Sequence, residues 1–287
     1  MSILHSQHRL DIQTPEGTRS MAYMQWHNSL HEQQPLLLCV HGLTRNSRDF
    51  DSLAEKLAEH YRVICPDVLG RGDSDWLQQP ALYGYPLYIA QMQQLLAHLF
   101  SEFAVSRCDW VGTSMGGLIG MMLAAAPGDT IGKLVLNDVG PFIPYSALAR
   151  LGQYVGKAPH FAHVGEAEQY LRQVAQPFGP LTDEQWAHLA LHGTESCDDG
   201  LCLRYDPAIA DGFAAVTGDV DLSAVWSAVH CPVLVIRGAE SDLLLAETAR
   251  SMLQHNDTQL VEFPGIGHAP MLMARDQITA VQNFLTR

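Results

Sequence analysis

The chain has 287 residues, and its 31 acidic and 17 basic side chains give a formal net charge of −14 at pH 7. An acidic chain is not expected to bind a nucleic-acid backbone or an anionic membrane surface. No uncharged apolar run approaches the roughly 18 residues of a membrane span, and the N-terminal residues do not resemble a signal peptide, so we expect a cytoplasmic protein.

The predicted elements begin with an antiparallel hairpin, because two strand-like segments flank the turn signal PEGT at residues 15–18. Short apolar runs then recur along the chain, each rich in Val, Leu or Ile and too short for a helix. Such runs are typical of strands buried on both faces of a parallel sheet. They cover residues 36–40, 62–65, 109–112, 133–137, 233–238 and 259–263.

Helical patterns separate most of these runs, at residues 49–60, 86–103 and 115–126. In the first pattern, Ser52 and Glu55 have the spacing of a capping box. Alternating strands and helices predict an α/β fold with a parallel sheet and right-handed crossovers.

The interval between the runs at 133–137 and 233–238 is too long for a simple crossover, since it holds 95 residues. Thr182 and Gln185 form a second capping-box pattern within it. We therefore predict an inserted helical cap at residues 140–230. Residues 1–139 and 231–287 would form the two parts of one core domain.

The strongest local motif is the G-x-S-x-G pentapeptide at residues 112–116, between an apolar strand and an apolar helix. Ser114 stands at its centre, where a tight turn would present the hydroxyl as a nucleophile. The turn needs small neighbours, because side chains at 112 and 116 would clash.

Two further loops suggest the partners of Ser114. The segment CVHGLTRN, residues 39–46, follows the first parallel run, and the N–H groups of Leu43 and Met115 could bind an oxyanion. His268 lies in the loop GIGHAPML after the last run, where it could act as a base. Asp242 follows the run at 233–238 and could orient the imidazole, while Asp138 is an alternative acid.

The order Ser114, Asp242, His268 resembles that of the α/β-hydrolase superfamily, as does the loop CPDVLGRGDSD at 65–75. The resemblance covers nearly the whole chain. It implies a mostly parallel eight-stranded sheet flanked by helices, with the long interval forming a helical cap over the site.

The resemblance also implies a serine esterase that acts on a small carboxylic ester through an acyl-enzyme, with no cofactor and no metal. Other activities stay open: a lactonase, a thioesterase, a C–C bond hydrolase, or a small-ligand receptor with little turnover. The expected partner is a small-molecule ester; neither a nucleic acid nor a membrane is expected, and the sequence does not indicate an oligomeric state.

Overall fold

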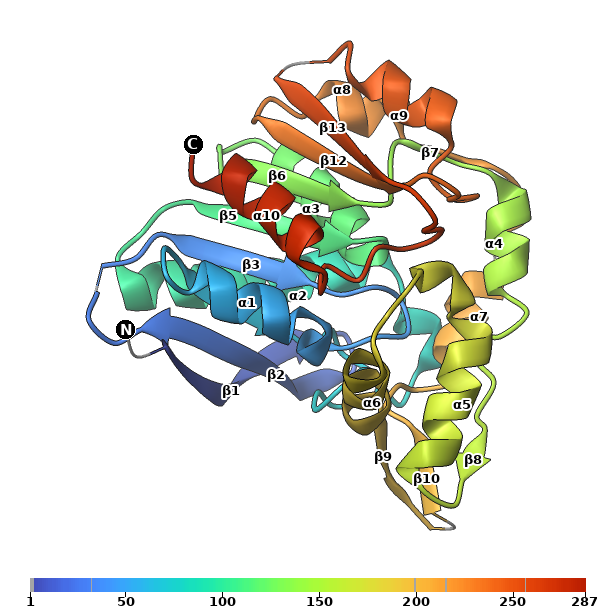
Figure 1. The fold of residues 1–287 in the computed structure, drawn as a ribbon. Coiled ribbons are helices and arrows are strands. Elements are labelled where there is room, and N and C mark those ends of the chain that lie inside the picture. The colour runs from blue at the N-terminus through green and yellow to red at the C-terminus, as the bar shows by residue number, and fades with distance from the viewer. Residues whose placement is uncertain (1–2, 32, 199, 215, 256) are drawn as a thin grey trace.

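An eight-stranded sheet forms the centre of the molecule (Figure 1). The structure is a computed structural model that describes residues 3–31, 33–198, 200–214, 216–255 and 257–287. In spatial order the strands are β1 (Ile3–Thr14), β2 (Gly17–Asn28), β4 (Arg62–Pro66), β3 (Leu36–Val40), β5 (Cys108–Thr113), β6 (Ile131–Asn137), β12 (Val233–Gly238) and β13 (Thr258–Phe263).

The six strands from β4 to β13 run parallel, and only the β1–β2 hairpin breaks the pattern. The hairpin lies at the sheet edge, with β2 antiparallel to β4. The predicted hairpin and the mostly parallel eight-stranded sheet are therefore confirmed. Because all six parallel strands end at the same edge, the loops that follow them gather there.

Helices cover both faces of the sheet, because neighbouring residues of each parallel strand point to opposite faces. In β3, Leu36, Leu38 and Val40 enter one buried layer, while Leu37 and Cys39 enter the other. The first layer contains α2 (Tyr85–Phe103), α3 (Met115–Ala125), α8 (Ser223–Ser227) and α9 (Ala246–Met252). The second contains α1 (Asp51–Leu57) and α10 (Arg275–Leu285), which lie in front of the sheet in Figure 1.

Between β6 and β12 the chain leaves the sheet and builds a separate cluster of short elements, drawn in green to orange in Figure 1. Its two ends meet where β7 pairs antiparallel with β11. A small apolar cluster of Leu171, Trp186 and Leu189 packs against Met271 of the loop after β13. The elements are β7 (Phe142–Ile143), α4 (Tyr145–Leu151), β8 (His160–Phe161), α5 (Val164–Val174), η3 (Gln176–Phe178), α6 (Asp183–His192), β9 (Thr194–Cys197), β10 (Gly200–Leu203), α7 (Ile209–Ala214) and β11 (Val220–Asp221).

The two predicted capping boxes have different outcomes. The box of Thr182 and Gln185 is confirmed, since it opens α6 with both reciprocal hydrogen bonds. The prediction that Ser52 and Glu55 form a capping box is wrong, because α1 already begins at Asp51 and follows a short helix, η1 (Ser47–Phe50). The side chain of Asn46 caps η1 instead. A second short helix, η2 (Pro80–Leu82), precedes α2.

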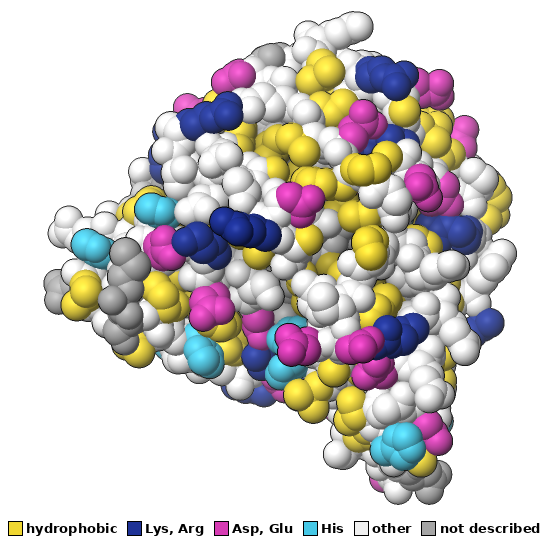
Figure 2. Space-filling model, viewed as in Figure 1, with side chains coloured by type: hydrophobic (Ala, Val, Ile, Leu, Met, Phe, Trp, Pro, Cys, Tyr) yellow, Lys and Arg dark blue, Asp and Glu magenta, His cyan; other side chains and the backbone are white. Residues whose placement is uncertain are grey.

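Within the described part of the chain, none of the helices is long and apolar enough to cross a membrane. On the face shown in Figure 2, basic side chains lie among the acidic ones, so no surface of a single sign dominates this view.

Candidate active site

Ser114 occupies the sharp turn between β5 and α3, with its backbone in the left-handed region at a φ of 51°. Glycines on both sides make this turn possible. A Cβ at Gly112 would overlap the backbone of Gly116, and a Cβ at Gly116 would overlap the carbonyl of Val40. The turn therefore projects the Ser114 hydroxyl from the end of the sheet, at the start of α3.

His268 lies between Ser114 and a carboxylate, in the loop that follows β13. Its Nε2 is 3.0 Å from Ser114 Oγ, and its Nδ1 is 2.7 Å from Asp138 Oδ2. A carboxylate only accepts hydrogen bonds, so Nδ1–H donates to Asp138 and Nε2 is left to accept from the serine hydroxyl. The three side chains form one continuous hydrogen-bonded line.

The carboxylate in this line is Asp138, the first residue after β6, and it is fully buried. Its Oδ1 accepts from the Gly238 N–H at 2.8 Å, and its Oδ2 accepts from the Ser241 hydroxyl at 2.6 Å. Together with His268, three donors surround the charge, which compensates for its removal from water.

The predicted contact between Asp242 and His268 is wrong. Asp242 instead pairs with Arg150 of α4, through hydrogen bonds of 2.5 and 2.8 Å, and its side chain is 47% exposed. Burial raises the pKa of Asp242, but the Arg150 hydrogen bonds and charge outweigh burial and lower it overall. The physical reason is the turn after β12, where the Ser241 N–H donates to Gly238 O, Ser241 faces Asp138 and Asp242 reaches outward to α4.

Leu43 and Met115 both line a cavity beside Ser114. Met115 is the first residue of α3, where backbone amides have no acceptor within the helix. Among the described residues, none accepts a hydrogen bond from the Leu43 amide. The loop that carries Leu43 lies next to Ser114, since a Cβ on Gly42 would be 3.9 Å from Ser114 Cβ.

Two buried polar residues that the sequence analysis did not select hold this loop. His41 accepts from the Val68 N–H at 3.0 Å and contacts the Gly42 carbonyl at 2.7 Å, while burial lowers its pKa to about 4. Arg71 is fully buried, and its Nε donates to the Leu43 carbonyl at 2.9 Å. The signal available in the sequence was their position in the segments at 39–46 and 65–75, which the sequence had already singled out.

Two cavities open on either side of Ser114. The arginine lobe, about 110 Å³, is lined by Arg45, Arg150 and His268 among others. The apolar lobe, about 230 Å³, is lined mainly by aliphatic and aromatic side chains, including Leu118, Val139, Ile143, Leu148 and Leu243. Both are small beside typical ligand pockets of roughly 300–1,000 Å³, so the site is suited to a small molecule.

The hydrogen-bonded side chains at Ser114 supply few metal ligands: the imidazole of His268 and the buried carboxylate of Asp138. In the described ranges, a cluster of three suitably placed ligand side chains occurs elsewhere, at Asp51, His188 and His192.

Comparison with known proteins identifies the family. Residues 37–281 match the model of the "Alpha/beta hydrolase family". The chain is 42% identical over 286 residues to a 3-hydroxybutyrate-oligomer hydrolase of Cupriavidus necator, covering 95% of each chain. It is 26% identical to a pimeloyl-[acyl-carrier protein] methyl ester esterase of Aliivibrio fischeri, covering 88% of this chain and 93% of the esterase.

Among solved structures, an alpha/beta hydrolase from Novosphingobium aromaticivorans superposes with a TM-score of 0.87 at 34% identity and covers 98% of both chains. The family match begins at residue 37, after the β1–β2 hairpin, and includes the segment between β6 and β12. The hydrolase relative of Cupriavidus necator and the solved hydrolase structure cover nearly the whole chain. The chain is therefore a hydrolase that belongs to the alpha/beta hydrolase family.

Proposed function

We propose that the protein is a serine hydrolase that cleaves a small carboxylic ester through an acyl-enzyme. The observation that carries the proposal is the hydrogen-bonded line from Asp138 through His268 to Ser114, which ends at two small cavities. In this assignment Ser114 is the nucleophile, His268 is the general base, and Asp138 is the acid that orients the imidazole.

The chemistry follows from the placement of the protons. Ser114 Oγ attacks the ester carbonyl as His268 Nε2 takes its proton, and the amides of Leu43 and Met115 bind the oxyanion. His268 then gives the proton to the departing alcohol. A water activated by the same nitrogen attacks the acyl group and releases the acid, which restores Ser114.

We further propose an ester of a short hydroxy acid as the substrate, of the kind named in the 3-hydroxybutyrate-oligomer hydrolase to which the chain is similar. The apolar lobe has room for a short acyl group. Arg45 and Arg150 line the arginine lobe, where the free carboxylate of such an oligomer would compete with Asp49 for Arg45 and with Asp242 for Arg150. Residues 140–230 would act as the cap, since Ile143, Leu148 and Tyr170 of that segment line the two lobes.

The test compares purified protein with its Ser114→Ala variant on p-nitrophenyl esters of increasing acyl length and on the linear dimer of 3-hydroxybutyrate. We expect turnover to be highest on short acyl chains and on the dimer. Ser114→Ala should lower kcat by a factor of about 10⁴ to 10⁶. Ser101→Ala, at an exposed position of α2, is the control and should leave kcat unchanged.

Wild-type turnover by Ser114→Ala would refute the mechanism. Faster cleavage of a thioester or a lactone of equal size would reassign the substrate while keeping the nucleophile. Turnover far below one per minute on every ester would favour a small-ligand receptor on this fold.

A further inference from the structure

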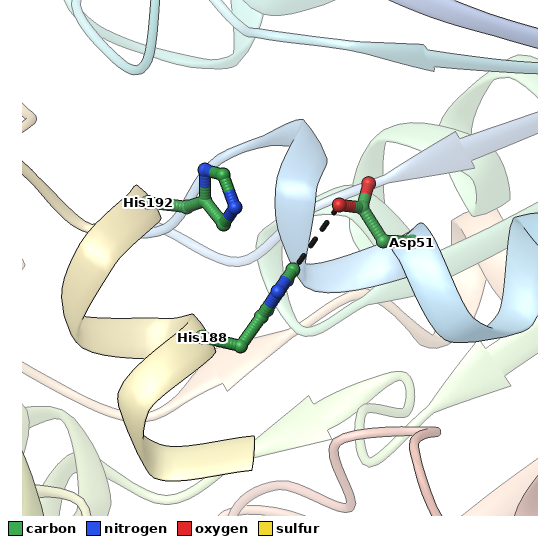
Figure 3. Close-up of side chains that lie close together, drawn as sticks. All are labelled: Asp51, His188 and His192. Carbon is green, nitrogen blue, oxygen red and sulfur yellow. Dashed lines mark ion pairs between the residues drawn. The ribbon is translucent and has the colours of Figure 1, made fainter. Parts of the chain in front are cut away.

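A second cluster of reactive side chains lies where the segment between β6 and β12 meets the core. His188 and His192 are one turn apart on α6, and Asp51 is the first residue of α1. One ligand atom from each of the three lies within 4.8 Å of the other two. Figure 3 shows His188 extending toward Asp51, with His192 on the same helix one turn away.

In the present contacts, Arg48 engages two of the three ligands. His188 Nε2 donates to the Arg48 carbonyl at 2.9 Å and lies 3.6 Å from Asp51 Oδ2, so an ion at this nitrogen would replace the hydrogen bond to the carbonyl. Asp51 accepts from Arg48 Nε at 2.8 Å and from Nη2 at 2.6 Å. The His192 ring packs against His188 at 4.5 Å between centroids, with the two planes tilted by 58°, and among the described residues its ring nitrogens have no hydrogen-bond partner.

The donor set has a definite metal preference. Imidazole nitrogens suit zinc, copper and nickel, whereas magnesium and calcium favour sites made of oxygen ligands alone. Histidines four residues apart lie on one face of a helix and can bind the same ion. Bonds of about 2.0–2.2 Å place tetrahedral donors roughly 3.3 Å apart, so modest side-chain rotations would close the present 4.8 Å.

We propose that Asp51, His188 and His192 bind one divalent transition-metal ion of the zinc class, with water completing the coordination. The ion links α6 to α1. Asp51 can bind it through a free lone pair while still accepting from Arg48, because a carboxylate has about four acceptor sites. The Arg48 guanidinium lowers the affinity by competing for the same carboxylate.

The proposed metal site lies beside the wall of the arginine lobe. Gly193, the residue after His192, lines the arginine lobe together with Arg45. The carbonyl of His192 already accepts from Asn46 at 2.8 Å, which ties this end of α6 to the loop before η1. An ion at the cluster therefore fixes one wall of the arginine lobe without touching Ser114 or His268.

The experiment measures Zn²⁺ binding to untagged, metal-free protein by calorimetry near pH 7.5, with Co²⁺ absorption as a spectroscopic readout. We expect one equivalent of Zn²⁺, a rise in Tm when it binds, and a four-coordinate Co²⁺ spectrum. His192→Gln should weaken binding by about tenfold or more. The matched control is His98→Gln, because His98 pairs with Glu102 one turn away on α2, outside the cluster, and it should bind as the wild type does.

Arg48→Gln gives an independent test, since it removes the competing cation and leaves all three ligands. We expect it to tighten Zn²⁺ binding severalfold. This variant and the Co²⁺ spectrum still decide the matter if His192→Gln fails to fold. The absence of binding at submillimolar Zn²⁺, or binding that neither His192→Gln nor Arg48→Gln changes, would overturn the proposal.

Discussion

Asp138 and Asp242 follow neighbouring strands, β6 and β12, yet their surroundings differ in almost every respect. Asp138 is fully buried and accepts from a backbone amide, a hydroxyl and an imidazole. Asp242 is nearly half exposed and pairs with one arginine. The difference shows that position after a strand is not enough to define a catalytic acid. The direction of the next turn decides which carboxylate meets the histidine.

The largest effect that would separate the two carboxylates is on catalysis. Asp138→Asn should lower kcat by about 10⁴-fold, because an amide cannot hold the imidazole with its Nδ1 proton toward residue 138 and its Nε2 free. The measurement is steady-state hydrolysis of a short p-nitrophenyl ester by the folded variant.

Asp242→Asn is the matched control, since it makes the same chemical change one strand away. We expect kcat to stay within about threefold of wild type, because Asp242 pairs with Arg150 while Asp138 is the carboxylate hydrogen-bonded to His268. The comparison would be broken by the reverse result, in which Asp242→Asn is inactive and Asp138→Asn is not.

A smaller effect is expected from the hydroxyl that supports Asp138. Ser241→Ala removes a donor 2.6 Å from Asp138 Oδ2, so the carboxylate orients His268 less firmly. We expect kcat to fall about tenfold, in line with the loss of roughly 1.5 kcal/mol from a charged hydrogen bond. KM should change little, and Ser241→Thr should restore most of the rate. An equal loss in kcat with Thr would show that Ser241 acts only through packing.

The smallest effect concerns the contribution of the Arg150–Asp242 ion pair to the stability of the fold. The folded pKa of Asp242 is lowered, so its contribution is present above the unfolded value of about 4 and is lost as pH falls through the lower folded value. Because both partners are partly exposed, Asp242→Asn should reduce the free energy of unfolding by less than about 1 kcal/mol at pH 7.

Urea denaturation of the wild type and of Asp242→Asn at several pH values gives the two free energies of unfolding and checks this expectation. The difference between them should shrink below about pH 4 and in high salt, which screens exposed pairs. A difference of several kcal/mol that persisted in acid would mean that Asp242 has a buried role.

Much of the fold could be predicted from the sequence, because the signals are local. The runs at 36–40 and 233–238 became β3 and β12 with the same residues, since strands buried on both faces read as unbroken apolar segments. The Ser114 turn was readable for a similar reason. The clashes that exclude side chains at 112 and 116 depend only on the nearby backbone.

The acid could not be chosen in this way. Asp138 and Asp242 both follow strands that end at the same edge of the sheet, and the implied family order favoured the later one. A closer signal was present, since Asp138 follows β6 at once while Asp242 lies four residues beyond β12. The contacts by which His41 and Arg71 hold the loop were equally hidden, because those contacts are made with backbone groups that any residue supplies.

The donors around Asp138 have a consequence for the nascent chain. All three come from residues 238, 241 and 268, while the proposed nucleophile and acid, Ser114 and Asp138, precede them in the chain. During synthesis from the N-terminus, the Asp138 charge therefore stays hydrated and without its donors until β12 joins the sheet. The proposed base is made later still, since His268 follows residues 238 and 241 in the chain. A product truncated before residue 268 would therefore carry Ser114 without His268, its proposed base.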